Sequence, residues 1–181
     1  MKPSKAIYVQ QATMDDLDAV MELIEDGRKA LHQNGVPQWQ DGYPSRLTMQ
    51  QDIDSENCYL LMYGNDIAGC ATLMLDGDTY YTHIVSGMWA RPGHAFATIH
   101  RVAISNKFRG MRLATYLFSD LISIAYREGV RNFRISTHEK NMAMQKILSA
   151  FGFVERGTVY TGPRPTDLRN AYEMNLKEEE E

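Results

Sequence analysis

The stretch from Ile99 to Phe153 constrains the fold more than any other part of this chain. An extended run, residues 99–104, leads into the basic, glycine-containing turn 108–114 and then into a helix-like pattern. A second strand-like run and a second helical pattern follow, closed by Gly152. At the start of a helix the backbone N–H groups point outward and the helix dipole favours an anion, most often a phosphate. The segment therefore predicts a strand–helix–strand–helix unit with an anion site at its first turn.

Hydrophobic periodicity predicts the remaining elements. Thr13 to Asp16 has the form of a capping box ahead of a helix that extends to about Gln33. Gly64-Asn65-Asp66 predicts a hairpin turn between two β-rich runs. The expected strands are 7–12, 58–63, 67–75, 97–104, 132–137, 154–160 and 170–176, and the expected helices are 17–33, 45–55, 110–128 and 141–151. Strands that alternate with helices in this order indicate an α/β protein with helices on both faces of its sheet.

Two motifs in this order resemble a known family. Arg109-Gly110-x-x-x-Ala114 resembles the acyl-CoA loop of the GNAT N-acetyltransferases, Q/R-x-x-G-x-G/A. Asn141 followed by Phe151-Gly152-Phe153 is similar to the second signature of that family. The resemblance covers most of the chain. It implies the GNAT fold, a mixed and mostly antiparallel sheet with two splayed central parallel strands and helices on both faces.

The resemblance also implies acetyl-CoA as a co-substrate, with no metal. Backbone groups of the central strand would pair with its thioester arm, and the turn would hold its pyrophosphate. The predicted cofactor contacts are Val102, Ala103, Ile104, Arg109, Gly110, Met111, Arg112, Leu113, Ala114 and Asn141. Arg112 replaces the middle glycine of the motif. We expect it in the first helical turn, where no positive φ is needed and its guanidinium can contact a phosphate. The alternative is an ordinary helix start with solvated arginines.

The resembled mechanism needs a base to remove a proton from the amine and often uses a tyrosine to protonate the thiolate. The position of that tyrosine is Leu148 here, which also fits the apolar stripe of its helix. We predict His100 as the base, because strand alternation places it on the face of Val102 and its usual pKa suits neutral pH. The alternative is a structural histidine. His138 is the second choice as base, and Tyr160 or Tyr172 would replace the missing acid.

Aromatic residues in two polar segments are the candidate acceptor contacts. Trp39 and Tyr43 follow the first helix in a stretch rich in Gln, Gly and Pro, and Trp89 precedes the central strand. Aromatic faces hold cationic amines well. The alternative is that these rings anchor long connections to the core.

Composition excludes several classes of function. A chain of 181 residues favours one domain, predicted here as 1–176 with an acidic tail at 177–181. The formal net charge of −4 argues against a nucleic-acid partner. No apolar run approaches the ~20 residues of a membrane span, and no secretory signal precedes the first strand, so we expect a cytoplasmic protein. Cys58 and Cys70 lie outside any metal-type spacing. The family resemblance makes a homodimer the expected assembly.

Two functions from different classes remain open at this point. The first is an acetyl-CoA-dependent N-acetyltransferase that acts on a primary amine of a small molecule or peptide. The second is a non-catalytic acyl-CoA-binding or sensing domain. Leu148 and Arg112 favour the second, whereas His100 and the aromatic segments favour the first. Because a thiol has a pKa of ~8.5, its thiolate departs partly unassisted, and we prefer the enzyme. A nucleotide-dependent enzyme ranks last, since the chain has no G-x-x-x-x-G-K-[ST] motif.

Overall fold

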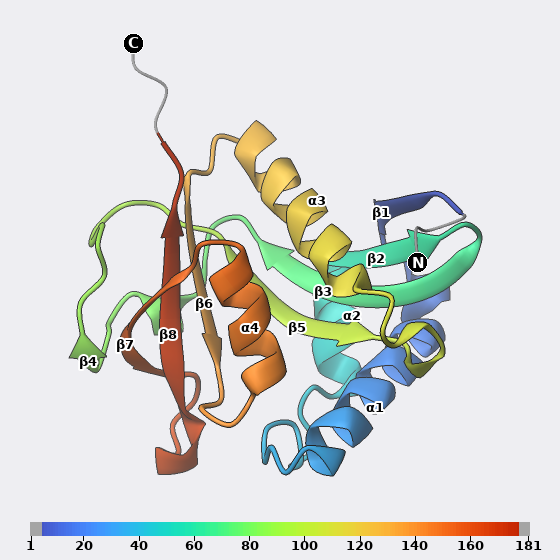
Figure 1. The fold of residues 1–181 in the computed structure, drawn as a ribbon, viewed down its shortest axis with the longest axis horizontal. Helices are drawn as coiled ribbons and strands as arrows, with labels where there is room; N and C mark the ends of the chain where they lie inside the picture. The colour runs from blue at the N-terminus through green and yellow to red at the C-terminus, as the bar shows by residue number, and fades with distance from the viewer. Residues whose placement is uncertain (1–4, 178–181) are drawn as a thin grey trace. The chain divides into compact units, whose positions relative to one another are not determined.

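The computed structural model describes residues 5–177, so most of the predicted acidic tail lies outside the described residues. The chain divides into two compact units, which are described separately (Figure 1). The first unit comprises Met1–Leu73 and His100–Ser123, and the second comprises Met74–Ile99 and Ile124–Glu181. The division falls inside two strands and inside one helix. The prediction of one domain over 1–176 stays a prediction.

The first unit is built from a four-stranded sheet and the helices around it. Its strands are β1 (Ile7–Gln11), β2 (Cys58–Tyr63), β3 (Asp66–Met74) and β5 (Thr98–Ile104), in the order β1-β2-β3-β5. Its helices are α1 (Leu17–Gln33), α2 (Arg46–Asp54) and most of α3 (Leu113–Arg127). The β2–β3 pair is antiparallel and forms the predicted hairpin.

Helices α1 and α2 pack on one face of this sheet (Figure 1). Alternate residues of β2, Cys58, Leu60 and Met62, share a core with Val20 and Ile24 of α1, as the two-residue period of a strand requires. Both cysteines are free and buried, and burial raises the pKa of the Cys58 thiol to about 12. The first unit therefore has a continuous apolar core beneath the helices.

The second unit contains its own four-stranded sheet. Its elements are β4 (Ser86–Gly87), β6 (Asn132–Thr137), α4 (Met142–Ala150), β7 (Val154–Tyr160) and β8 (Leu168–Asn175). The strand order is β4-β7-β8-β6, and the paired strands β4/β7, β7/β8 and β6/β8 are antiparallel. A parallel bridge joins Ala97 to Phe133 at the edge strand β6.

The predicted strands and helices all occur, with ends that differ by a few residues. The largest difference is at α3, which begins at Leu113 rather than Gly110. Gly110 has a φ of 84° and Arg112 a φ of 59°, and neither value is compatible with a right-handed helix. The strands also form two separate sheets among the described residues, where the sequence predicts one.

Candidate active site

The turn between β5 and α3 has the geometry of an anion-binding loop. After Ile104, the Ser105 N–H donates to the Ala68 carbonyl at 2.9 Å, which ties the loop to β3. A short 3-10 turn, Asn106–Phe108, follows, and the Phe108 ring meets Tyr63 edge-on with centroids 5.6 Å apart. Arg109 is extended, Gly110 is left-handed, and α3 then begins at Leu113. The loop is thus anchored at its entrance while its tip projects from the core.

The tip of this loop presents backbone donors to solvent. Arg109, Gly110, Met111 and Arg112 are all exposed. The N–H groups of Gly110 and Arg112 have no protein acceptor among residues 5–177. The N–H groups of Leu113 and Ala114 belong to the first turn of α3, where backbone N–H groups have no acceptor within the helix. Leu113 buries its side chain in the core, so it offers only its N–H. Two arginines and a helix N-terminus make this turn suitable for a phosphate group.

A carboxylate of α1 holds the entrance of the loop. Asp26 accepts hydrogen bonds from the backbone N–H and the side-chain amide of Asn106, each at 2.9 Å. Asn106 in turn accepts from the guanidinium of Arg109. Asp26 therefore fixes Asn106, which orients Arg109 at the loop tip.

The expected conformation of Arg112 is wrong. It lies before the helix rather than in the first helical turn, and its φ of 59° is left-handed. A non-glycine residue in this region costs about 1–2 kcal/mol. The glycine of the family motif therefore occupies a position where glycine is favoured sterically, and Arg112 adopts the same backbone at an energetic cost.

Arg101 interrupts the regular alternation of β5. Its φ of 52° is left-handed, which a flat strand does not allow. The inference that His100 and Val102 share a face rests on unbroken alternation and therefore does not hold. His100 itself is half-buried on β5, immediately before the irregular residue. Its predicted role as base is not tested by this arrangement.

The Arg101 side chain forms a buried ion pair that ends at Tyr43. Its Nε and Nη2 donate to the two oxygens of Asp52 in α2 at 2.6 and 2.7 Å. Thr72 also donates to Asp52, at 2.6 Å. The remaining terminal nitrogen, Nη1, donates to the Tyr43 phenol oxygen at 2.7 Å. Tyr43, one of the predicted acceptor contacts, is 43% exposed and is thus held from beneath by a fixed cation.

Trp39 lies in the core of the first unit. Only 9% of its surface is exposed, and it packs with the buried residues of α1, α2 and β5. A Cβ on Gly27 would lie 2.8 Å from its ring, which explains a glycine in the middle of α1. The polar segment carries this tryptophan because its ring fills the core. Contact with an acceptor stays a prediction, with little ring surface left for it.

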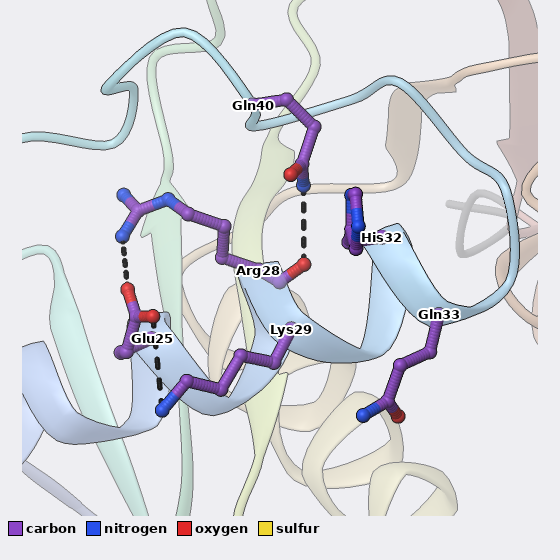
Figure 2. A pocket seen from close by; sticks show the side chains of 6 residues that line it. All are labelled: Glu25, Arg28, Lys29, His32, Gln33 and Gln40. Carbon is purple, nitrogen blue, oxygen red and sulfur yellow. Dashed lines mark hydrogen bonds and ion pairs between the residues drawn. The ribbon is translucent and has the colours of Figure 1, made fainter.

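Arg28 anchors the segment that carries Tyr43. Its Nε donates to the Trp39 carbonyl at 3.0 Å and its Nη2 to the Pro44 carbonyl at 3.1 Å. Glu25 pairs with the same guanidinium, and Gln40 donates to the Arg28 carbonyl at 3.1 Å (Figure 2). A surface pocket of about 310 Å³ lies here, lined by Glu25, Arg28, Lys29, His32, Gln33 and Gln40. The guanidinium of Arg28 is thus bound to backbone carbonyls of the loop that carries Tyr43.

In the second unit, Asn141 caps α4. Its side-chain oxygen accepts from the Met144 N–H at 3.2 Å, so part of its hydrogen-bonding capacity is structural. Leu148 is fully buried, which confirms it as a core residue.

Burial, together with the positive charge of Arg169, lowers the pKa of His138 below its usual 6.5. Tyr172 is buried and hydrogen-bonds Glu155 at 3.4 Å, whereas Tyr160 is exposed.

Trp89 is also a core residue. It is 4% exposed, and the Arg134 guanidinium stacks on its ring at 4.4 Å and on the Phe96 ring at 4.1 Å. A cation of the protein itself therefore occupies the face that we predicted would hold an amine. Its contact with an acceptor stays a prediction, and its observed partner is Arg134.

Arg134 belongs to a second buried ionic centre. Its terminal nitrogens donate to the Tyr81 and Arg91 carbonyls, each at 3.0 Å. Its Nε lies 3.6 Å from Glu173, whose other oxygen accepts from the Ala90 N–H at 2.6 Å. These contacts fix the long connection before β5 onto the sheet of the second unit.

Comparison with known proteins decides the family. Residues 18–153 match the model of the acetyltransferase (GNAT) family. A crystal structure of a GNAT-family acetyltransferase from Streptococcus agalactiae is 33% identical, with a TM-score of 0.83, over 95% of this chain and 96% of that one. This chain belongs to the GNAT acetyltransferase family. Its α/β GNAT fold, with antiparallel sheets and four helices, agrees with the fold implied by the sequence motifs.

More distant structures share the fold of this GNAT acetyltransferase. A GNAT-family acetyltransferase from Listeria monocytogenes is 18% identical, with a TM-score of 0.71, over 94% of this chain and 95% of that one. The ribosomal-protein-S18-alanine N-acetyltransferase of Escherichia coli is 17% identical, with a TM-score of 0.62, over 94% and 93%. A search of curated protein sequences gave no match.

Two features of the described residues concern metal-binding clusters and membrane-spanning helices. Between residues 5 and 177, His, Cys, Asp and Glu side chains form no group of three or more that could hold a metal ion. None of the helices in the same range combines the length and the apolar composition that a membrane crossing demands.

Sequence reasoning missed two residues of this GNAT acetyltransferase that the structure places beside predicted ones. Arg101 lies between His100 and Val102, and Asp52 lies on a helix to which no role was given. A signal for Arg101 exists, because a charged residue inside an apolar strand needs a partner. Nothing local identifies Asp52 as that partner, since the two are 49 residues apart.

Proposed function

We propose that this chain is an acetyl-CoA-dependent N-acetyltransferase that acts on a primary amine of a small molecule or peptide. The observation that carries the proposal is the exposed turn at residues 109–114, with its outward N–H groups and two arginines. Family membership supports acetyl transfer in general. The turn adds a specific reason to expect a cofactor that carries phosphates.

The turn would hold a pyrophosphate through its backbone and its two arginines. The N–H groups of Gly110, Arg112, Leu113 and Ala114 would bind its oxygens, with Arg109 and Arg112 supplying charge. Val102, Ala103 and Ile104 on β5 would pair through their backbone with the thioester arm. Asn141 is assigned the same cofactor in addition to its capping role. The bound group supplies an activated acetyl thioester.

His100 is assigned the proton-removing role. A neutral amine nitrogen forms a bond to the acetyl carbon, the C–S bond breaks, and the proton lost from nitrogen passes to the imidazole. The sulfur leaves as a thiolate, which is stable enough near neutral pH to need little help. This matters because Leu148 holds no proton to donate and is buried in the core.

Tyr43 is assigned to the acceptor. It is exposed, unlike the buried rings of Trp39 and Trp89. A non-catalytic acyl-CoA-binding domain is the second candidate, and the burial of Leu148 in place of the usual acid favours it. We keep the enzyme as the first candidate because loss of the acid slows thiolate departure without preventing it.

An acetyl-transfer assay distinguishes the two candidates. Purified protein, acetyl-CoA and a panel of amines are followed by release of free thiol and by the mass of the acetylated amine. The enzyme predicts thiol release that depends on both the amine and the protein. Cofactor binding without amine-dependent thiol release would support the binding domain instead.

The double variant Arg109→Glu, Arg112→Glu ties that activity to the turn. It should abolish CoA binding and transfer while the protein stays folded. The matched control is Arg127→Glu, Lys177→Glu, which changes the net charge equally at two exposed positions that do not belong to the turn. Equal activity in both double variants would remove the turn from the proposal.

A further inference from the structure

The phenol of Tyr43 is an oriented hydrogen-bond donor. Its oxygen accepts from Nη1 of Arg101 at 2.7 Å. A guanidinium has only donors, so in this contact the phenol oxygen must be the acceptor. The phenolic hydrogen is therefore available to another group. Among residues 5–177 the structure gives the Tyr43 hydroxyl no acceptor, and the residue is 43% exposed.

The cation beneath Tyr43 cannot turn away from it. The two oxygens of Asp52 hold two nitrogens of Arg101, and Thr72 holds Asp52 in place. The side chains of Arg101 and Asp52 are only 10% and 11% exposed. Burial alone would lower the pKa of Arg101, but its pairing with Tyr43 and Asp52 raises that pKa overall. Arg101 thus remains charged and held in place, and its hydrogen bond holds the Tyr43 hydroxyl in place.

The backbone places this arrangement beside the residues assigned to the reaction. Arg101 follows His100 and precedes Val102 on β5. Its left-handed φ of 52° departs from the strand conformation around it. Such conformations cost energy, persist only where the surrounding structure holds them, and are common at functional sites. With this backbone, Arg101 directs its side chain to Asp52. The same guanidinium holds Tyr43 of the loop next to β5.

We propose that Tyr43 donates its phenolic hydrogen bond to an oxygen of the acceptor, so the acceptor is an amine that carries a carbonyl or carboxylate group. Amino acids and peptides belong to this class. Simple alkylamines and polyamines do not, because their polar groups are cationic and offer no acceptor oxygen. The inference rests on the proposed function and narrows its substrate.

Paired amines test this directly. Leucinamide and 3-methylbutylamine differ only in the carboxamide, as do phenylalaninamide and 2-phenylethylamine. An α-amino group has a pKa of about 8 and an alkylamine one of about 10.4, so kcat/KM is expressed per concentration of neutral amine. On this scale the parent protein should acetylate the amide-bearing member of each pair with the higher kcat/KM. A preference for the alkylamines would overturn the proposal. CoA binding without transfer to any amine would refute the enzyme and favour the binding domain. A protein that binds no CoA would instead refute the proposed function.

Substitution of Tyr43 separates hydrogen bonding from packing. Tyr43→Phe should lower kcat/KM for the amide-bearing amines about 10–100-fold, mainly through KM, because a site that loses a donor leaves the acceptor oxygen unpaired. The KM for acetyl-CoA and the kinetics with the alkylamines should not change. Tyr8→Phe is the matched control, since Tyr8 is 41% exposed on β1. An equal loss for both classes of amine would overturn the proposal.

Arg101→Lys tests the positioning role. Lysine keeps the charge but cannot hold both oxygens of Asp52 and Tyr43 at once. It should reduce the selectivity between the paired amines in the same direction as Tyr43→Phe, with the melting temperature recorded to confirm that the variant is folded. Full selectivity in a folded Arg101→Lys protein would show that the arginine does not orient Tyr43.

Discussion

Each unit of this GNAT acetyltransferase buries an arginine against a carboxylate, but the two arginines differ in what completes their hydrogen bonding. Arg134 in the second unit ends on two backbone carbonyls and lies between two aromatic rings. Arg101 in the first unit ends on the exposed phenol of Tyr43. The first arrangement is closed and holds a loop in place. The second reaches the surface and orients a residue that can bind a ligand.

Backbone strain differs between the units in the same way. Among residues 5–177, the non-glycine residues with positive φ are Trp39, Glu56, Arg101 and Arg112. All of them belong to the first unit, whereas the second unit adopts positive φ only at glycines. Unfavourable conformations often concentrate where function requires a particular geometry. Two of these residues, Arg101 and Arg112, lie in or next to the segments assigned to acetyl-CoA.

The largest loss of stability is expected when Arg134 is removed from the buried ionic centre of the second unit. Arg134→Ala removes one of the two guanidinium partners of the fully buried Glu173, together with the contacts to two aromatic rings, so the free energy of unfolding should fall by about 3 kcal/mol. Urea denaturation measures this, with the exposed Arg127→Ala as control. The affinity for CoA should not change in the folded variant. A loss below about 1 kcal/mol would mean that the centre is not structural.

The same substitution at Arg101 should cost less stability and more function. Asp52 keeps its bond from Thr72, and its side chain is 11% exposed where that of Glu173 is fully buried, so we expect a loss of about 2 kcal/mol. The KM for an oxygen-bearing amine should rise in Arg101→Ala and stay constant in Arg134→Ala. The contrast between the two arginines would be wrong if both variants changed that KM equally.

Relief of backbone strain should give a smaller gain. Arg112→Gly removes the steric cost of a left-handed side chain but adds freedom to the unfolded chain, for a net stabilisation of about 0.5–1 kcal/mol. Glu56→Gly, at a φ of 58°, should stabilise similarly. Only Arg112→Gly should weaken CoA binding. Unchanged affinity would show that the Arg112 guanidinium makes no contact with a phosphate.

The smallest effect concerns acid stability in the second unit. Burial, and after it the charge of Arg169, lowers the pKa of His138 in the folded protein. As the pH falls through 6.5, the His138 imidazole is therefore protonated in the unfolded chain before it is protonated in the folded protein. Stability should therefore decrease below pH 6.5 and level off once the folded state is also protonated. Unfolding free energies between pH 7.5 and pH 5, compared with those of His138→Gln, measure this. Parallel curves for the two proteins would contradict the lowered pKa.

Local pattern predicted the elements well. The α1 helix ends at Gln33 as expected, because apolar residues at helical spacing and the following Asn-Gly are both local signals. The hairpin β2–β3 and the strands β6 and β7 were equally predictable from alternation and turn residues. The turn at residues 109–114 was singled out from its motif; residues 109–112 are exposed, and contact with acetyl-CoA stays a prediction.

Conformation and long-range pairing were not predictable in this way. The left-handed backbone of Arg112 depends on how the loop joins β5 to α3. A glycine at this position would have indicated a positive φ, whereas an arginine does not. The burial of Trp39 depends on Gly27 in α1, which opens space for the ring from a distant position. Gly27 was the available signal, since a glycine inside a helix costs about 1 kcal/mol and needs a reason.

The most direct test of the account is a thermal-shift titration of the parent protein with acetyl-CoA, CoA, ATP and NAD in parallel. A ligand at about a hundred times its Kd adds roughly 2.7 kcal/mol, which in a chain of this size raises the melting temperature by about 5–10 °C. We expect this shift with acetyl-CoA and CoA, none with NAD, and none in the Arg109→Glu, Arg112→Glu variant. No shift with either CoA compound would contradict the assignment of the turn between β5 and α3 to this cofactor.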